Sequence, residues 1–217
     1  MICGIDEAGR GPVIGPMVVA GVWIKEGEND VLKKMAIKDS KKHTKKQREK
    51  HAKKIREMFF HSFIIISPED IDALRSTMSM NELEIHLFAT LGKKREADIY
   101  YIDSADVDEK RFGEEFKKNL GFKAEIISKH DADNLFPVVS AASIIAKVER
   151  DAEMEKIANM LQKKLDIPIG SGYPSDEKTR LFIKKWIEKF GDVPPYTRRS
   201  WKTVKKLTAE VKQKKLF

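Results

Sequence analysis

The sequence has only one cysteine, Cys3, among its 217 residues. One cysteine cannot form an internal disulfide, so we expect a reducing compartment, the cytoplasm. No run approaches the about 18 apolar residues of a membrane span, and the N-terminus lacks the basic-then-apolar pattern of a signal peptide. We therefore expect no membrane association. The five histidines are scattered along the chain, so a zinc cluster is not expected either.

The charge balance is basic, with 42 Lys and Arg residues against 34 Asp and Glu residues and a formal net charge of +8. Such a charge attracts polyanions such as nucleic acids, although many basic proteins bind none. A non-catalytic RNA-binding protein is therefore one open interpretation. The length favours one domain or one with a small appendage, and we expect a monomer because no apolar surface is left unexplained.

Apolar patterning predicts an α/β fold. Five short runs rich in Ile, Val, Phe or Tyr are predicted strands, at residues 2–6, 17–24, 59–66, 99–103 and 124–128. Strands that come close together and then alternate with helices indicate a sheet with an antiparallel part followed by a parallel part.

Helix signals lie between and after these strands. Thr44 and Ser67 are predicted helix caps, and the helix after Thr44 should be mostly solvated, with Ala52, Ile55 and Met58 on its apolar face. Helical spacing of apolar residues also predicts a buried stripe from Met80 to Leu91 and helices over 138–164 and 176–190, the latter two including Met160 and Phe190.

Acidic residues occur where predicted strands end. Asp6 and Glu7 close the first strand, Asp103 closes the fourth, and Asp133 follows the fifth. The carboxyl ends of parallel strands line the binding crevice of an α/β sheet, so these side chains could meet. Carboxylates without His or Cys suit Mg²⁺ or Mn²⁺, and a pair of such ions supports phosphoryl displacement. Each acid alone is more often a helix or turn cap, so only the combination favours a metal site.

Six blocks of the sequence together resemble one known family. They are G-I-D-E-A-G-R-G-P-V-I-G-P at 4–16, K-D-S-K-K at 38–42, Y-I-D at 101–103, A-D-x-x-x-P-V-V-S-A-A-S-I-I-A-K-V-x-R-D at 132–151, G-S-G-Y-P-S-D at 170–176 and R-R-S-W-K-T at 198–203. In this order they resemble the type 2 ribonucleases H (ribonuclease HII), in particular the archaeal branch. The combination of D-E-A-G-R-G with S-A-A-S-I-x-A-K is highly specific.

The resemblance implies a ribonuclease H-like mixed five-stranded sheet flanked by helices, with a helical C-terminal segment. It implies that Asp6, Glu7, Asp103 and Asp133 are catalytic and bind two Mg²⁺ or Mn²⁺ ions. The implied activity is that of an endoribonuclease on RNA/DNA hybrids and on ribonucleotides embedded in duplex DNA, which leaves 3′-hydroxyl and 5′-phosphate ends. A water activated by metal attacks, so no side-chain nucleophile is needed.

The resemblance also implies substrate contacts. The backbone of Gly9, Arg10 and Gly11 would contact the ribose 2′-hydroxyl, which separates RNA from DNA. Tyr173 would pack on the sugar that follows the ribonucleotide, although a core role for this tyrosine is equally open. Phosphate ligands would come from lysine and hydroxyl side chains, namely Lys41, Lys42, Ser140, Ser143 and Lys147.

The chain departs from the family pattern near Asp133. Asp131 adds a second acid there, and we choose Asp133 as the metal ligand because its spacing to Pro137 fits the family. Phe136 stands where many relatives have a tyrosine, which should leave packing intact.

The tail allows two interpretations. Gln213, Leu216 and Phe217 resemble a shortened motif for binding the replication sliding clamp, whereas a frayed basic tail is the alternative we favour. We expect a catalytic domain over 1–169, a helical substrate-binding segment over 170–207 and a flexible tail over 208–217.

Two other classes of protein explain the sequence less well. A strand-transferring enzyme of ribonuclease H-like fold would leave the G-R-G and G-Y-P segments unexplained. A nucleotide-binding protein is disfavoured because neither G-x-G-x-x-G nor G-x-x-x-x-G-K-[ST] is present.

Overall fold

The computed structural model describes residues 1–35, 37 and 43–214. Its strands are β1 (Ile2–Ala8), β2 (Met17–Ile24), β3 (Phe60–Ile66), β4 (Ile99–Asp103) and β5 (Glu125–Lys129). Its helices are α1 (Asn29–Lys34), α2 (Lys45–Met58), α3 (Pro68–Leu74), α4 (Met80–Gly92), α5 (Glu109–Leu120), α6 (Ala132–Leu135), α7 (Pro137–Gln162), α8 (Glu177–Phe190) and α9 (Lys202–Lys214).

The strands form one five-stranded sheet in the order β3-β2-β1-β4-β5. Strand β1 pairs antiparallel with β2 and parallel with β4, and β4 pairs parallel with β5. The predicted mixed five-stranded sheet is therefore confirmed. The two parallel pairings bring the carboxyl ends of β1, β4 and β5 to the same edge of the sheet.

The chain packs as two compact units, each with its own apolar core. The first unit comprises Met1–Ala8, Val18–Ile65 and Met78–Glu149, and the second comprises Gly9–Met17, Ile66–Thr77 and Arg150–Phe217. The domain boundaries expected after residues 169 and 207 stay predictions about separate domains.

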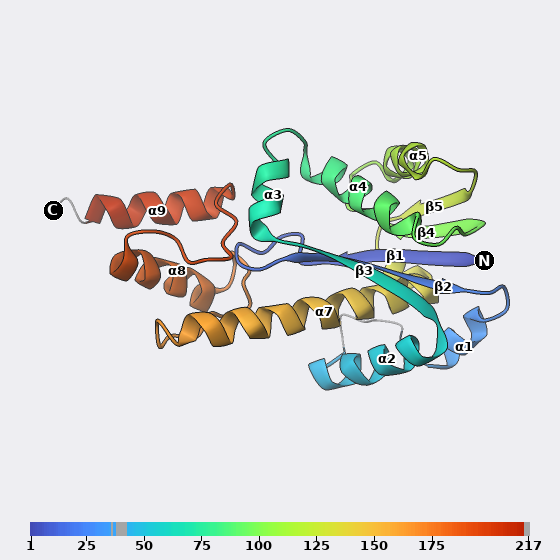
Figure 1. The fold of residues 1–217 in the computed structure, drawn as a ribbon, viewed down its shortest axis with the longest axis horizontal. Coiled ribbons are helices and arrows are strands. Elements are labelled where there is room, and N and C mark those ends of the chain that lie inside the picture. Colours follow the sequence, from blue (N-terminus) through green and yellow to red (C-terminus); the bar gives the residue numbers. More distant parts are fainter. Residues whose placement is uncertain (36, 38–42, 215–217) are drawn as a thin grey trace. The chain divides into compact units, whose positions relative to one another are not determined.

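In the first unit, helices cover both faces of the sheet (Figure 1). Residues of β2 pack with α1, α2 and the start of α7, whereas α4 and α5 lie against the opposite face. Gly4 allows α7 to approach β1, because a Cβ there would lie 2.5 Å from the Val138 carbonyl. A larger residue at position 4 would therefore separate the strand that carries the first two acids from this helix.

Helix starts follow the predicted capping residues. Thr44 forms a capping box with Gln47, and the Ser67 hydroxyl accepts a hydrogen bond from the Asp70 N–H. Met58, Met160 and Phe190 belong to the apolar patterns that predicted these helices, yet their exposed fractions are 53%, 47% and 45%. Each of these residues lies at or near the end of its helix, where the packed face runs out.

Helices dominate the second unit. Its core joins Val13 and Ile14 to α8, α9 and the latter part of α7. The predicted helical C-terminal segment is confirmed. Residues 208–214 of the predicted flexible tail are helical, while residues 215–217 lie outside the described part of the chain.

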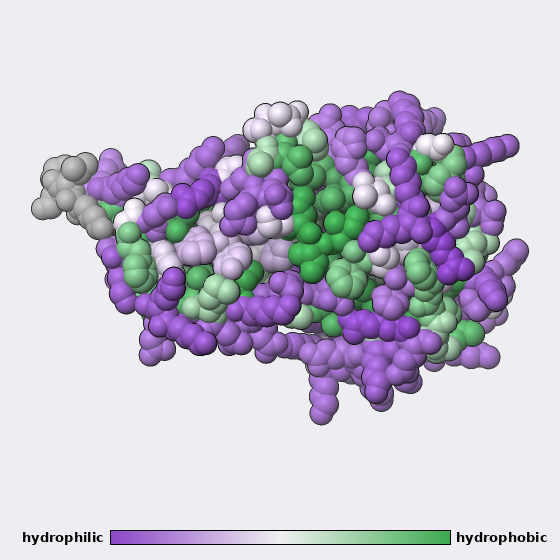
Figure 2. Space-filling view, viewed as in Figure 1, coloured by the Kyte–Doolittle hydropathy of each residue, from purple (hydrophilic) through white to green (hydrophobic). Residues whose placement is uncertain are grey.

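The surface is polar over most of the face in view, with apolar side chains gathered over β3 (Figure 2). Phe60 and Ile65 of this edge strand are 42% and 41% exposed. Across residues 1–35, 37 and 43–214, no helix has the length and apolar character needed to cross a membrane.

Candidate active site

Three carboxylates of the first unit converge at the ends of β1 and β4. Ile5 lies opposite Ile102 in the parallel pair, so the residues that follow them, Asp6 and Asp103, share one edge of the sheet. One carboxylate oxygen from each of Asp6, Glu7 and Asp103 lies within 4.8 Å of the others. We call these three residues the acid cluster. Its geometry suits a shared cation.

Burial and mutual repulsion make ionisation of the acid cluster costly. Burial raises the pKa of Asp6, although the charge of Lys147 and a hydrogen bond from Ser143 oppose that rise. Burial, and after it the charges of Glu84, Asp6 and Asp103, raise the pKa of Glu7 well above its usual value. A cation bound here would reverse both effects because it stabilises the charged carboxylates.

Asp133 lies on α6 with an exposed fraction of only 2%, and its charge contributes to the raised pKa of Asp6. Its Oδ2 is 3.8 Å from Nζ of Lys147, whose Nζ also donates to the Ser143 hydroxyl at 2.6 Å. Asp131, the neighbouring acid, is exposed and has a positive φ of 50°. Asp133 is therefore the one of the two that faces the acids of β1.

Ser140 and Ser143 lie on α7 and are fully buried. The Ser140 hydroxyl donates to the backbone carbonyl of Asp133, and Ser143 hydrogen-bonds Asp6. In this structure both hydroxyls hold acids in place. Their predicted role as phosphate ligands stays a prediction.

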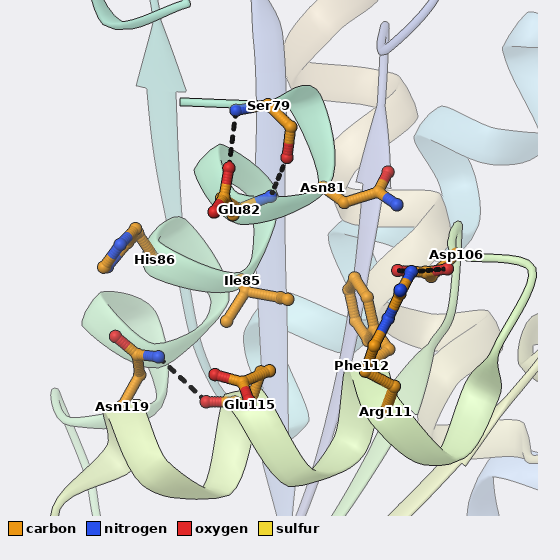
Figure 3. A pocket seen from close by; sticks show the side chains of 10 residues that line it. All are labelled: Ser79, Asn81, Glu82, Ile85, His86, Asp106, Arg111, Phe112, Glu115 and Asn119. Carbon is orange, nitrogen blue, oxygen red and sulfur yellow. Dashed lines mark hydrogen bonds and ion pairs between the residues drawn. The ribbon is translucent and has the colours of Figure 1, made fainter. Parts of the chain in front are cut away.

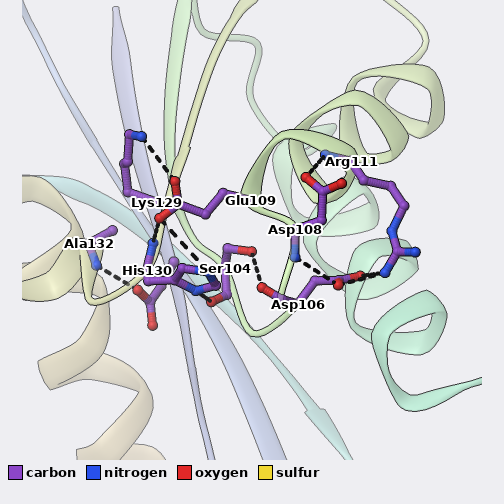
Figure 4. Close-up of polar contacts among 9 residues, drawn as sticks. Ser104, Asp106, Asp108, Glu109, Arg111, Lys129, His130 and Ala132 are labelled. Atoms are coloured by element: carbon purple, nitrogen blue, oxygen red, sulfur yellow. Dashed lines mark hydrogen bonds and ion pairs between the residues drawn. The ribbon is translucent and has the colours of Figure 1, made fainter.

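A polar network connects the end of β4, which carries Asp103, to the segment between β5 and α6 (Figure 4). Asp103 Oδ1 accepts the Ala132 N–H at 2.6 Å, which ties the end of β4 to the start of α6. Glu109 accepts the backbone N–H of His130 at 2.7 Å and Nζ of Lys129 at 2.9 Å. The His130 ring is 2.9 Å from the Ser104 carbonyl, and this contact raises the pKa of His130. The Asp103 side chain is thus bound to the backbone of the residue directly before Asp133.

The acid cluster fits a divalent cation. Glu7 Oε2 is buried and accepts no hydrogen bond from any residue that the structure describes. A buried carboxylate oxygen without a donor is costly, and a metal ion would satisfy it. All the donors are hard carboxylate oxygens, which suit Mg²⁺ or Mn²⁺ better than zinc.

In the second unit, Gly9, Arg10 and Gly11 form a turn that leaves Gly11 exposed and Gly9 buried. Gly9 has φ of +89°, and a Cβ there would lie 2.6 Å from the Pro16 carbonyl oxygen. A Cβ on Gly11 would lie 3.7 Å from Cε1 of Tyr173, which is an ordinary contact distance. The exposed glycine and the tyrosine are therefore neighbours, as a shared substrate contact requires.

The loop that carries Tyr173 is firmly held. Asp176 Oδ2 accepts the Ser171 N–H at 2.6 Å, a bond that lowers the pKa of Asp176 to about 2. The hydroxyl of the buried Thr179 accepts the Gly172 N–H at 3.0 Å. Tyr173 itself is 38% exposed, with the Arg150 guanidinium 5.2 Å from its ring centroid. An exposed aromatic ring on an anchored loop can stack on a ligand.

Several predicted contacts cannot be placed. Lys41 and Lys42 lie outside the described residues, as do Leu216 and Phe217 of the suggested clamp motif. Gln213 is exposed on α9.

A cavity of about 430 Å³ lies between α4 and α5, and Figure 3 shows its lining. None of the four predicted acids lines it. Arg111 there is bound to both carboxylate oxygens of Asp106, at 2.6 and 2.5 Å. This cavity is therefore separate from the acid cluster.

Sequence reasoning missed three residues around these sites. Glu84 is fully buried on α4, and its charge acts on Glu7; the signal was an acid between the core residues Leu83 and Ile85. Arg150 and Arg198 stand within motifs that we quoted without giving these residues a role. Arg198 is fully buried, which a charged residue in a basic segment does not suggest.

Comparisons with known proteins agree on one family. The family model described as Ribonuclease HII matches residues 3–204. A curated Ribonuclease HII from Thermococcus onnurineus is 46% identical over 208 residues, which cover 95% of this chain and 89% of the relative.

Solved structures give the same result. The ribonuclease H2 from Pyrococcus horikoshii matches with a TM-score of 0.88 and 40% identity, over 98% of this chain and 99% of that one. The PCNA:RNase HII complex from Archaeoglobus fulgidus matches with a TM-score of 0.86 and 40% identity, over 95% of this chain and 96% of that one.

Proposed function

The chain belongs to the ribonuclease HII family, and we propose on that basis that it cuts the RNA strand of RNA/DNA hybrids and single ribonucleotides embedded in duplex DNA. The family is one of metal-dependent ribonucleases, so the chain is a hydrolase of phosphodiester bonds. Cutting at an embedded ribonucleotide would start its removal from DNA and so serve repair and replication. The observation that carries the proposal is the convergence of Asp6, Glu7 and Asp103.

In the proposed mechanism, the acid cluster and Asp133 hold two Mg²⁺ or Mn²⁺ ions. When bound, such ions supply the activation of the attacking water and the neutralisation of charge that develops on the phosphate. Asp103 is held for this task by the Ala132 N–H, and Asp6 by Ser143 and Lys147. The cut leaves 3′-hydroxyl and 5′-phosphate ends.

Recognition of the substrate would lie with the second unit and with basic groups near the acids. The peptide groups of Gly9, Arg10 and Gly11 would contact the ribose 2′-hydroxyl, and Tyr173 would stack on the next sugar. Lys147, 24% exposed, would contact a phosphate; Lys41, Lys42, Ser140 and Ser143 stay candidates for the same task.

A non-catalytic RNA-binding protein accounts for the charge of +8 but not for the acid cluster. Converging carboxylates repel a polyanion unless cations neutralise them, so pure binding would be weakened by them. The cytoplasm and the monomeric state stay predictions.

The tail suggests a partner. A relative with 40% identity has been solved as a complex with PCNA, and Gln213 of this chain is exposed near the C-terminus. We propose that Gln213, Leu216 and Phe217 bind the replication sliding clamp. Deletion of residues 208–217 should then abolish binding to the clamp in a surface-capture titration; unchanged affinity would reject the partner and leave the nuclease proposal intact.

The nuclease proposal is tested with a labelled DNA duplex that contains one ribonucleotide, with and without Mg²⁺. We expect cutting at the ribonucleotide only with Mg²⁺, and a loss of at least about 100-fold in Asp6→Asn because a charged metal ligand is lost. Asp106→Asn is the matched control. Asp106 has the same exposed fraction as Asp6, 3%, but pairs with Arg111 outside the acid cluster. Metal-dependent cutting retained by Asp6→Asn would refute the proposed site.

A further inference from the structure

The guanidinium of Arg198 is fully buried in the second unit. Its hydrogen bonds to described residues all go to backbone carbonyl oxygens, and it lies over the Trp201 ring, 5.0 Å from the ring centroid. Nη2 donates to Gly9 at 2.5 Å and to Gly15 at 2.9 Å, Nη1 donates to Arg10 at 2.8 Å, and Nε donates to Gly15 at 3.1 Å. Among the described residues no carboxylate lies within ion-pair distance of it. A buried charge without a counter-ion costs free energy, so this arrangement needs a reason beyond packing.

The neighbouring arginine makes quite different contacts. Arg199 is 60% exposed and pairs with Asp192 at 2.7 Å, and its backbone N–H donates to Asp72 at 2.6 Å. Of these two adjacent arginines, Arg199 therefore forms an exposed ion pair, whereas Arg198 is buried and donates hydrogen bonds to backbone carbonyls. Arg198 binds the turn formed by Gly9, Arg10 and Gly11, which we call the glycine turn.

Arg198 determines which way two peptide groups face. It binds the carbonyl oxygens of Gly9 and Arg10, which belong to the peptide groups Gly9–Arg10 and Arg10–Gly11. In a trans peptide the N–H points opposite to the C=O, and the described residues contain no cis peptide. The N–H groups of Arg10 and Gly11 therefore point away from Arg198. Gly11 is exposed, so a ligand can reach the turn that carries this N–H.

A second arginine, Arg150, binds the loop that carries Tyr173, which we call the tyrosine loop. Arg150 donates to the Ser171 carbonyl at 3.0 Å and lies over the Tyr173 ring. The Gly172 carbonyl accepts the Val13 N–H at 2.7 Å and the Ile14 N–H at 3.3 Å. The glycine turn and the tyrosine loop are thus held together by backbone bonds, and neither can reorient alone.

We propose that Arg198 is the positioning residue that orients the peptide groups of Gly9, Arg10 and Gly11, and through them sets the preference for a ribose over a deoxyribose. It touches no substrate atom in this account and acts through the backbone it binds. The inference rests on the proposed function, because it needs a substrate that contains a ribonucleotide.

The test compares KM for a duplex containing one ribonucleotide with Ki of the all-DNA duplex of the same sequence, used as a competitive inhibitor. Neither constant depends on the fraction of active enzyme. In Arg198→Lys, KM should rise about tenfold while Ki stays unchanged, which is the change expected when one hydrogen bond to a ligand hydroxyl is lost. A lysine has its three donors on one nitrogen, so it lacks the planar fork by which Nε, Nη1 and Nη2 of Arg198 bind separate carbonyls. Arg199→Lys is the control and should leave both constants unchanged.

An unchanged ratio of Ki to KM in folded Arg198→Lys and Arg198→Gln would overturn the inference, as would an equal rise of both constants. Loss of folding in both variants, measured by circular dichroism, would also overturn it, because Arg198 would then be a structural residue. Failure of the unmodified protein to cut the ribonucleotide duplex would instead refute the proposed function.

Discussion

In the first unit, three carboxylates converge and repel one another; in the second unit, three backbone carbonyls converge on a guanidinium that stabilises them. Both sites gather partial or full negative charge: the acids do so near the ends of β1 and β4, and the carbonyls do so in the segment that follows β1. In the proposed mechanism the acid cluster depends on a cation from solution, whereas the cation that binds the glycine turn is part of the chain, Arg198. We therefore expect metal concentration to affect the acid cluster, whereas substitution of Arg198 should affect the glycine turn.

The strongest test of this contrast changes the glycine turn without touching the acids. Gly9→Ala places a Cβ 2.6 Å from the Pro16 carbonyl oxygen at a residue with φ of +89°. Such strain costs about 1–3 kcal/mol, so we expect the melting temperature to fall by about 5 °C or more and cutting to fall with it. Differential scanning calorimetry measures this change.

Gly11→Ala is the matched variant, because its Cβ would meet only Tyr173, at 3.7 Å. We expect its melting temperature to stay within about 1 °C of the unmodified value, as for ordinary surface changes. Equal destabilisation by both substitutions would show that Gly9 has no special backbone role.

Tyr173→Ala should give an intermediate effect confined to recognition. The ring is 38% exposed on an anchored loop, so its removal should leave folding intact. We expect a loss of about tenfold on a duplex with a single ribonucleotide, which is the contribution of one stacked ring, and a smaller loss on a uniform RNA/DNA hybrid. Rates on the two substrates measure this; equal losses would reject a role at the RNA-to-DNA junction.

The smallest expected effect is on the melting temperature of the metal-free protein, through the ionisation of Glu7. Burial raises the pKa of Glu7 well above its usual value of 4.5, so the folded state disfavours the ionised form. The stability that Glu7 contributes is therefore present below pH 4.5 and is lost as the pH rises through the folded pKa. Glu7→Gln, which cannot ionise, should melt about 2–4 °C higher than the unmodified protein at pH 8, a gain of about 1 kcal/mol.

This difference should vanish near pH 4 and should reverse when Mg²⁺ is added, because only the carboxylate gains from the ion. Melting curves with and without EDTA at several pH values measure it. A difference that does not vary with pH would contradict the claim that repulsion and burial oppose ionisation of Glu7.

Much of this architecture follows from local sequence. Alternating apolar runs placed all five strands to within two residues, and Thr44 and Ser67 mark helix starts by hydrogen bonds that their side chains make locally. The sequence placed Asp6 and Asp103 at the ends of two predicted strands, and the two acids meet because those strands, β1 and β4, are parallel neighbours.

Other features depend on tertiary packing that no local pattern records. Glu84 belongs to a buried helix face and becomes part of the site only because α4 lies against β1. Arg198 lies 183 residues from Gly15, and nothing around it in the sequence indicates that its partners are carbonyls rather than phosphates. The division into two units that interleave along the chain is likewise a property of the folded state.

We infer that the acids depend on a metal ion and that the glycine turn does not. Calorimetric titration of Mn²⁺ into the unmodified protein, Asp6→Asn and Arg198→Lys tests it directly. We expect equal Mn²⁺ affinity for the unmodified protein and Arg198→Lys, and a loss of at least about tenfold in Asp6→Asn. Unchanged Mn²⁺ affinity in Asp6→Asn, or the same loss in Arg198→Lys, would contradict it.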